Sequence, residues 1–436
     1  MSFFRRKVKS GALAARAEEQ FGVGVNAPAS GAMDGCVAAW RGAPYWLDGD
    51  EGVVTVNFAA AICAELARLA CLAIKITVGG ENDRARWLQK QIDSLYFRLR
   101  PWMETACAWG TVILKPNGES VELLTPDRFL ITQTDGETVT GCVFESGTYD
   151  AHRARYYTRL EYHRFLPDGR YAVSNRCFEG ASPSDWGKPV DMEATPWAGL
   201  CPDVIAEGLD RPLFAMLRMP GADGCMGRPV FAAAMTELKD LDVAYSRMTE
   251  EIADSRRISL IDDRLIDCPG KAPVRLPRFA RRVFGMGPEE VYRDIDPALH
   301  TAQRLTGINA LLGQIGFKCG FSNGYFVFNE RGGLMTATEV EADDRRTVQL
   351  VKDIRDSLEA ALDGLIYALD KMADALQSCP PGEYTPVYDF GDVTYSREED
   401  RARWYGYVAD GRMPFWMYLV KFEGYSEEEA KAIAGT

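Results

Sequence analysis

Glu161 and His163 are the two residues whose types and spacing best suit proton-transfer chemistry. They lie within or just after the segment 156–162, whose composition predicts a β-strand, and side chains two positions apart on a strand project to the same face. A carboxylate beside an imidazole can act as a general acid/base pair. The chain has only three histidines and no accompanying partner motif. The expected role of the pair is therefore a salt bridge or hydrogen bond on a sheet surface, and we predict no catalytic residue.

Two pairs of acidic residues could hold a metal ion. Asp262-Asp263 and Asp343-Asp344 each offer adjacent carboxylates, which are ligands that hard cations accept. No further ligand pattern surrounds either pair, so we predict solvent-facing carboxylates and no metal site. The phosphate-binding pattern GxxxxGK[ST] is absent, and the glycine pairs at 79–80 and 332–333 lack the flanking residues of a phosphate site. We predict no cofactor.

The densest positive charge lies between residues 271 and 282, a stretch without any acidic residue. Its basic residues are Lys271, Arg275, Arg278, Arg281 and Arg282. Such a cluster can contact DNA phosphates, dock onto an acidic protein surface or form a solvated face. The sequence leaves these three alternatives open.

The composition predicts a folded protein of two to four domains, because 436 residues are 47 % hydrophobic and 26 % charged. The net charge of −13 argues against a protein that grips nucleic acid over a broad basic surface, but not against one past which DNA slides. The eleven cysteines are odd in number and form no CxxC pair, which predicts buried thiols in a reducing compartment.

No targeting or membrane segment is predicted. The N-terminus lacks the apolar core of a signal peptide. The most apolar stretch, residues 58–78, is interrupted by Glu65, Arg68 and Lys75, so it predicts a core helix rather than a membrane span.

The first half of the chain predicts helices followed by an antiparallel sheet packed against them. Residues 1–30 are expected to form a mobile polar arm. Asn57 is expected to cap a helix that ends near residue 72, and Pro101 is expected to separate a helix over 84–99 from one over 102–109. Strands are predicted at 111–115, 121–124, 129–132, 141–144 and 156–162, many separated by Asn-Gly or Asp-Gly turns.

The second half predicts two medium helices around a small β-containing module. A helix should begin at Pro229 and end near residue 256, and another should span about 297–317. A Gly/Asn-rich connector at 320–335 precedes a helix of about 40 residues that starts at Thr336 and ends before Pro380. A strand at 387–390 and helices near 396–410 and 426–434 follow, whereas 181–228 cannot be assigned. The predicted fold class is α+β and helix-rich, with the basic module at the far end of a helical hairpin.

Five segments together resemble a known family. They are the aromatic cluster Trp40–Trp46 with Asn57 and its helix; Trp102–Pro116, with Ala-Trp-Gly and Lys-Pro; Tyr156–His163 with Tyr171 and Asn175; Gly320-Phe-Ser-Asn-Gly-Tyr-Phe before Thr336-Ala-Thr-Glu-Val340; and Ala409-Asp-Gly-Arg with Gly424–Ala430. Spanning about residues 36–432 in family order, they resemble the portal proteins of tailed bacteriophages. The similar branch comes from long-tailed phages of Gram-positive hosts and is often labelled minor head or minor capsid protein. Thr-Ala-Thr-Glu-Val before the long helix is the most specific feature.

The resemblance implies a portal fold with the following parts. They are a mobile arm at 1–30, a wing at 31–227, a stem helix at 228–257, a clip at 258–295, a second stem helix at 296–317, a tunnel loop at 318–335, a long wing/crown helix at 336–378 and a C-terminal wing/crown segment at 379–436. Residues 182–227 resemble nothing in the family, so their place in the wing stays open.

The resemblance also implies a function without catalysis. The subunits would form a ring, usually of twelve copies, at one capsid vertex of the virion, after assembly in the bacterial cytoplasm. Double-stranded DNA would pass through the ring during packaging and ejection. The terminase large subunit, head-completion or adaptor proteins, and major capsid and scaffolding proteins would be its partners, with no membrane involved.

Two sets of site residues follow from the resemblance. The tunnel-loop residues expected to line the DNA channel are Lys318, Asn323, Asn329 and Arg331. The clip residues expected to form a docking surface are Arg264, Lys271, Arg275, Arg278, Arg281 and Arg282. The alternatives are another head-tail connector or structural protein of a phage-derived particle and, with less support, a hydrolase that uses Glu161, His163 or a cysteine.

Overall fold

The structure is a computed structural model of the chain. It describes residues 10–24, 30–49, 52–118, 120–182, 185–221, 224–255, 258–262, 280–283, 292–295, 299–322, 324–327, 337–391, 404–423, 425 and 427–435. Helices and mainly antiparallel sheets make up the described part, which confirms the predicted α+β class.

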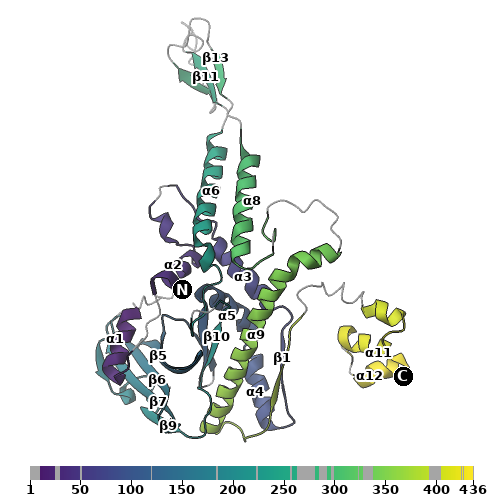
Figure 1. The fold of residues 1–436 in the computed structure, drawn as a ribbon. Helices are drawn as coiled ribbons and strands as arrows, with labels where there is room; N and C mark the ends of the chain where they lie inside the picture. Colours follow the sequence, from purple (N-terminus) through teal and green to yellow (C-terminus); the bar gives the residue numbers. More distant parts are fainter. Residues whose placement is uncertain are drawn as a thin grey trace.

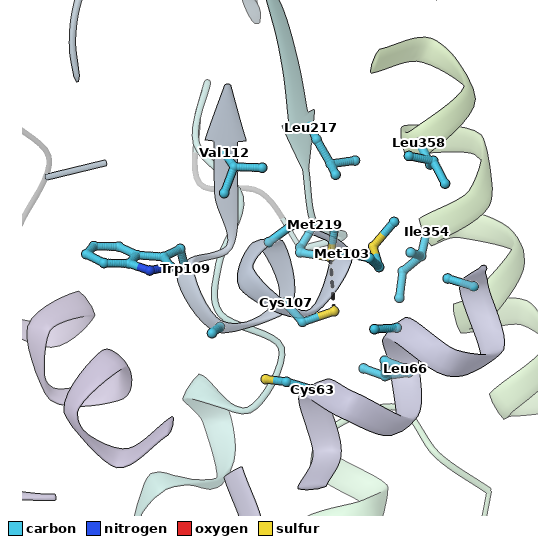
Figure 2. Close-up of a cluster of buried hydrophobic side chains, with 14 of the residues drawn as sticks. Cys63, Leu66, Met103, Cys107, Trp109, Val112, Leu217, Met219, Ile354 and Leu358 are labelled. Atoms are coloured by element: carbon cyan, nitrogen blue, oxygen red, sulfur yellow. Dashed lines mark hydrogen bonds between the residues drawn. The ribbon is translucent and has the colours of Figure 1, made fainter. Parts of the chain in front are cut away.

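Five helices build the centre of the body. They are α2 (Ser30–Trp40), α3 (Phe58–Ala70), α4 (Asp83–Asp93), α5 (Tyr96–Trp109) and α9 (Ala337–Ala375). Their apolar faces meet in one core, in which Leu66 of α3, Met103 of α5 and Leu358 of α9 are at most 2 % exposed. Figure 2 shows these side chains converging with Val112 and Leu217 from two strands. This core therefore joins segments almost 300 residues apart in the chain.

Pro101 does not separate two helices, contrary to the prediction. The break lies at residues 94–95, and Pro101 lies inside α5. The proline removes one helical N–H donor, but Leu99 and Met103 on either side of it are buried in the core. Burial of this continuous apolar face outweighs the loss of one hydrogen bond.

Asn57 does not cap α3 with its side chain. Its backbone is left-handed, with φ of 52°, and its side chain forms no hydrogen bond to the first turn of the helix. The helix nevertheless begins at Phe58 because Ile62, Cys63 and Leu66 are fully buried.

Two antiparallel sheets lie beside these helices. The larger has the order β4-β5-β6-β7-β8, with β9 also paired to β7, and the smaller has the order β10-β2-β3. Their strands are β2 (Thr111–Asn117), β3 (Ser120–Leu124), β4 (Phe129–Asp135), β5 (Thr138–Asp150), β6 (Arg155–Phe165), β7 (Tyr171–Gly180), β8 (Lys188–Val190), β9 (Asp203–Ala206) and β10 (Ala215–Arg218). The predicted antiparallel sheet region is confirmed, and the unassigned stretch contributes β8, β9, β10 and a short 3-10 helix, η2 (Met192–Ala194).

The N-terminal segment contains a docked helix, in contrast to the expected mobile arm. Helix α1 (Ser10–Phe21) places Leu13 and Ala17, each at most 1 % exposed, against the larger sheet. Phe21 packs on Tyr162 with a ring separation of 5.1 Å. The small, alanine-rich sequence looked polar overall, but its few apolar residues share one helical face.

Two helices project from the body as a hairpin. Helix α6 (Met235–Asp254) lies beside α8 (Thr301–Lys318), and Figure 1 shows a small sheet at their far end. In that sheet β11 (Ile258–Asp262) lies between β12 (Ala280–Val283) and β13 (Tyr292–Ile295). The predicted helix–small module–helix order is confirmed at this level.

Helix α6 begins later than its sequence predicts. A 3-10 turn, η3 (Ala232–Ala234), precedes Met235. The chain before it is bound to the body, because Val230 N–H donates to Cys107 O at 3.0 Å and Gly227 N–H donates to Thr111 Oγ1 at 2.7 Å. These bonds keep Pro229 out of the helix.

The chain after α8 returns to the body. The 39 residues of α9 correspond to about 58 Å. The chain then reverses, and β14 (Thr385–Asp389) pairs antiparallel with β1 (Lys75–Gly79). Residues 404–409, α11 (Phe415–Tyr418), a π-helical turn at Leu419–Glu423 and α12 (Glu427–Ala434) form a small module around Tyr418 and Phe422. No helix in the described part of the chain is long and apolar enough to cross a membrane.

Candidate functional site

The small sheet at the hairpin tip holds the described part of the basic cluster. Arg281 and Arg282 lie on β12, in parallel register with Leu260 and Ile261 of β11, and Arg281 is exposed. Arg264, Lys271, Arg275 and Arg278 lie outside the described residues. The structure therefore places two of the six predicted docking residues at the tip.

The acidic pair at 262–263 is not an exposed pair of carboxylates. Asp262 is 1 % exposed on β11, and Asp263 lies outside the described residues. On the neighbouring strand β13, Asp294 lies opposite Ser259 and accepts hydrogen bonds from Ser259 Oγ at 2.6 Å and from Tyr292 OH at 2.5 Å. These carboxylates belong to the small sheet itself. Among the described residues, no group of three or more His, Cys, Asp or Glu side chains is arranged to hold a metal ion.

Lys318 lies in the last turn of α8 rather than in a loop. Its ammonium group donates to Glu237 Oε1 of α6 at 2.5 Å. This ion pair ties the two helices together where they leave the body, so the cation is already engaged. The other predicted channel residues, Asn323, Asn329 and Arg331, lie outside the described residues.

The described residues after α8 are packed against the body and contain no strand. Phe321 is fully buried, and Phe326 contacts Phe58 of α3 with a ring separation of 5.0 Å. Ser322 N–H donates to Thr347 Oγ1 of α9 at 2.8 Å, and Tyr325 OH donates to Glu65 of α3. The described residues 319–322 and 324–327 of the predicted loop are therefore held against the body.

Glu161 and His163 lie inside the protein, in a buried ionic cluster. Glu161 Oε2 accepts from Lys115 Nζ of β2 and from Arg159 of β6, each at 2.8 Å, and Glu161 Oε1 pairs with His163 Nε2 at 2.8 Å. The exposed fraction of the four side chains is at most 13 %. His163 Nδ1 lies 2.9 Å from Tyr171 OH. The predicted ion pair or hydrogen bond is confirmed, although it lies between two sheets and not on a surface.

Burial and neighbouring charges set the protonation of this cluster. Burial alone would raise the pKa of Glu161, but Lys115, His163 and Arg159 hold that pKa well below its usual value. Burial lowers the pKa of His163 more than the Glu161 carboxylate raises it. A neutral imidazole fits the geometry if Nε2–H donates to Glu161 and Nδ1 accepts from Tyr171. Tyr171 OH in turn accepts from Leu213 N–H at 3.1 Å, so the network is structural.

Two buried arginines that sequence reasoning missed hold the body together. Arg84 of α4 is fully buried and donates to Asp370, Asp374 and the carbonyls of Cys379 and Pro380. Arg355 of α9 donates to the carbonyls at the end of α3, Leu69 O at 3.0 Å and Ala70 O at 3.2 Å. Arg355 satisfies carbonyls at the end of a helix, whereas Arg84 binds carbonyls of the segment that follows α9. The only signal in the sequence was an arginine at an apolar helical position.

A third missed group is Asp242, a buried carboxylate on α6. It accepts from Trp46 Nε1 and from Val56 N–H, both at 2.9 Å, while Ser246 Oγ one turn later accepts from Val54 N–H at 2.9 Å. Residues 46–49 and 52–56 are thereby bound along the root of the hairpin. Trp46 was noticed as part of an aromatic cluster, but its partner lies 196 residues away.

A cavity of about 490 Å³ lies between β1 and α4. Tyr96 OH and Gln89 Oε1 accept from the N–H groups of Ile76 and Val78 at 2.6 and 2.7 Å. These side chains occupy the edge of β1 that β14 leaves open, and thereby block further strand pairing. Nothing in the lining resembles a catalytic or cofactor site.

Most cysteines are buried thiols, as predicted. Cys36, Cys63, Cys107, Cys142, Cys177 and Cys319 are buried, and Cys201 is exposed. Burial raises the pKa of Cys36 to about 11 and that of Cys319 to about 12. These thiols are protonated at neutral pH and are poor nucleophiles. Cys268 lies outside the described residues.

No protein-family model matches the chain, and no curated protein sequence matches it.

Proposed function

We propose that this chain is the subunit of a bacteriophage portal, a ring-shaped channel for double-stranded DNA. The observation that carries the proposal is the hairpin of α6 and α8, which projects from the body and ends in a small three-stranded sheet (Figure 1). A portal subunit needs such a stem and clip so that its docking surface stands clear of the capsid shell.

The order of parts along the chain supports the same proposal. The hairpin is followed by a short connecting segment and then by α9, a helix of 39 residues. This order accompanies the five segments that resemble portal proteins, including Thr336-Ala-Thr-Glu-Val340. A smaller connector protein would have no need of so long a helix or of a separate body.

In this proposal the tip of the hairpin docks partners. Arg281 is exposed there and would contact an acidic surface of the terminase large subunit during packaging, and of head-completion or adaptor proteins afterwards. The protein would stand at the capsid vertex of the virion, in contact with the major capsid and scaffolding proteins.

The proposed ring has no catalytic activity. Glu161 and His163, the best candidates for proton transfer, are buried and held by Lys115, Arg159 and Tyr171. The net charge of −13 per chain would weaken binding to DNA phosphates and let the duplex slide.

The first test is the mass of the purified 48.4-kDa chain in solution, with negative-stain images of the same sample. We expect rings of about a dozen subunits with a central hole. If the chain stays monomeric alone and also with its scaffolding protein, the portal proposal fails.

A second test addresses docking at the tip. Arg281→Glu should abolish binding of the terminase large subunit to the ring, since charge reversal places like charges in contact. Arg170→Glu, at an exposed turn before β7, is the matched control and should bind normally. Equal binding by both variants would exclude Arg281 from the docking surface.

A further inference from the structure

Two hydrogen-bond donors lie buried beside the ionic cluster without an acceptor. Among the described residues, neither Arg159 Nε nor Ser146 Oγ has a hydrogen-bond partner, although Arg159 is 3 % and Ser146 8 % exposed. The two residues are directly opposite each other on β6 and β5. Their side chains therefore project from the same face, with Cβ atoms about 5 Å apart. Buried donors without an acceptor are rare in native proteins because they are costly.

The charges around these donors do not balance. The cations of Lys115 and Arg159 both bind one carboxylate, that of Glu161. Burial lowers the pKa of His163, so the imidazole is neutral at pH 7 and does not change the net charge of the cluster. Glu122, directly opposite Lys115 on β3, is neutralised by its ion pair with Arg128. Lys115, Arg159 and Glu161 together thus carry one excess positive charge in a region shielded from water, an arrangement that favours a bound anion.

The surroundings enclose the donors and leave space nearby. Trp197 covers the Arg159 guanidinium, 5.3 Å from the ring centre, and Thr195 next to it is 6 % exposed. Cys177, directly opposite Arg159 on β7, lines a neighbouring cavity of about 180 Å³, several times the roughly 30 Å³ that one water molecule occupies. Arg159 and Ser146 themselves do not line this cavity.

Two other groups in the lining of this cavity favour a water molecule there over an anion. Asn175 Oδ1 is a buried acceptor without a partner among the described residues, and it suits a water molecule. Asp191 also lines the cavity and would repel an anion. The anion is therefore placed at the unpartnered donors of Arg159 and Ser146, which lie outside the lining of this cavity.

We infer that Arg159 Nε and Ser146 Oγ form an internal binding site for a small monovalent inorganic anion, with chloride as the physiological candidate. The anion would neutralise the excess charge and stabilise the pairing of β5, β6 and β7. This site is independent of the proposed portal function, because it lies within the sheet of a single subunit.

The test compares thermal unfolding of the full chain in sodium chloride, sodium bromide and sodium gluconate at equal ionic strength. Gluconate, a large organic anion, serves as the comparison that we expect not to bind. We expect the Tm to be higher by about 2 °C or more in chloride and bromide. Arg159→Gln should abolish this difference, and Ser146→Ala should weaken anion binding roughly tenfold.

Arg170→Gln is the matched control, because it makes the same charge change at an exposed ion pair with Asp168 and should keep the full anion effect. Should Arg159→Gln not fold, Ser146→Ala still tests the site, since it removes a single hydroxyl group. Diffraction from bromide-soaked crystals should show an anomalous peak between Arg159 and Ser146. An equal Tm in all three salts, or water in place of bromide, would overturn the inference.

Discussion

The guanidinium of Arg84 donates to both the main-chain carbonyl of Asp370, at 2.6 Å, and its carboxylate, at 2.9 Å. The two residues are 286 positions apart, and Arg84 is fully buried. This contact joins α4 to the end of the 39-residue helix α9 and to the turn that leads into β14.

Replacing Arg84 should therefore weaken the whole body. Arg84→Met removes the donor to Asp370 Oδ1, to Asp374 and to the carbonyls of Cys379 and Pro380, and we expect the free energy of unfolding in urea to fall by about 3–5 kcal/mol. Arg86→Met is the control, because Arg86 is an exposed residue of the same helix that pairs with nearby Asp83. It should cost less than about 1 kcal/mol. Equal losses in both variants would contradict the assigned role of Arg84.

Because His163 is buried, we expect the free energy of unfolding to fall in mild acid. Burial lowers the folded-state pKa of His163 below 6.5, so the unfolded state binds the proton more tightly. Stability from this residue is complete above pH 6.5 and is lost as the pH falls toward the folded-state pKa, with a slope of at most about 1.4 kcal/mol per pH unit.

Urea unfolding between pH 7.5 and 5 measures this slope. His163→Gln should flatten it, whereas His152→Gln, at an exposed turn, should leave it unchanged. A wild-type slope that persists in His163→Gln would assign the titration to another group. Glu161, whose pKa is held well below 4.5, adds a further loss only at lower pH, as the pH falls through its folded-state value.

The Asp242 carboxylate should stabilise the backbone segment that lies along the root of the hairpin. Asp242→Ala removes the acceptor for Trp46 Nε1 and Val56 N–H, and we expect a loss of about 1–3 kcal/mol. Hydrogen exchange should accelerate at the Val56 and Val54 amides. Asp240→Ala, an exposed position of the same helix, is the control. Unchanged exchange at Val56 would show that packing alone holds this segment.

Gly110 should tolerate no side chain. Its φ is 76°, and a Cβ atom would lie 2.4 Å from the Arg228 carbonyl carbon and 2.5 Å from Gly227 O. Gly110→Ala should destabilise the fold by about 3 kcal/mol or more, because both the conformation and the contact are unfavourable. Gly118 has a similar φ of 62° with open space around it, so Gly118→Ala should cost only about 1 kcal/mol. Comparable losses would mean that backbone strain, and not the contact, decides the effect.

The identity of most elements was predictable because it depends on local patterns. The strands from Thr111 to Gly180 are rich in β-branched and aromatic residues, and Asn117-Gly118, Asp135-Gly136 and Asp168-Gly169 mark three of the turns between them. The apolar stripe of α9 repeats every three or four residues. Both are properties of neighbouring residues. The break between α4 and α5 was misplaced at Pro101 because a local rule about proline was outweighed by burial of Leu99 and Met103.

The partners of the polar residues were not predictable. Two residues apart on a strand, Glu161 and His163 were correctly expected to share a face, but not to be buried beneath Lys115 from another sheet. Likewise, Arg84 and Asp242 looked like ordinary helix residues until chain segments nearly 200 or 300 positions away were brought against them.

The sequence by itself determined the α+β class, the helix–small module–helix order and the long helix that follows, because periodicity and turn residues act over a few positions. Only the tertiary structure decided which charges are buried, that α1 docks on the sheet and that Lys318 pairs with Glu237. Those outcomes depend on contacts between distant segments, where the cost of burying a charge must be offset by a partner that no local pattern specifies.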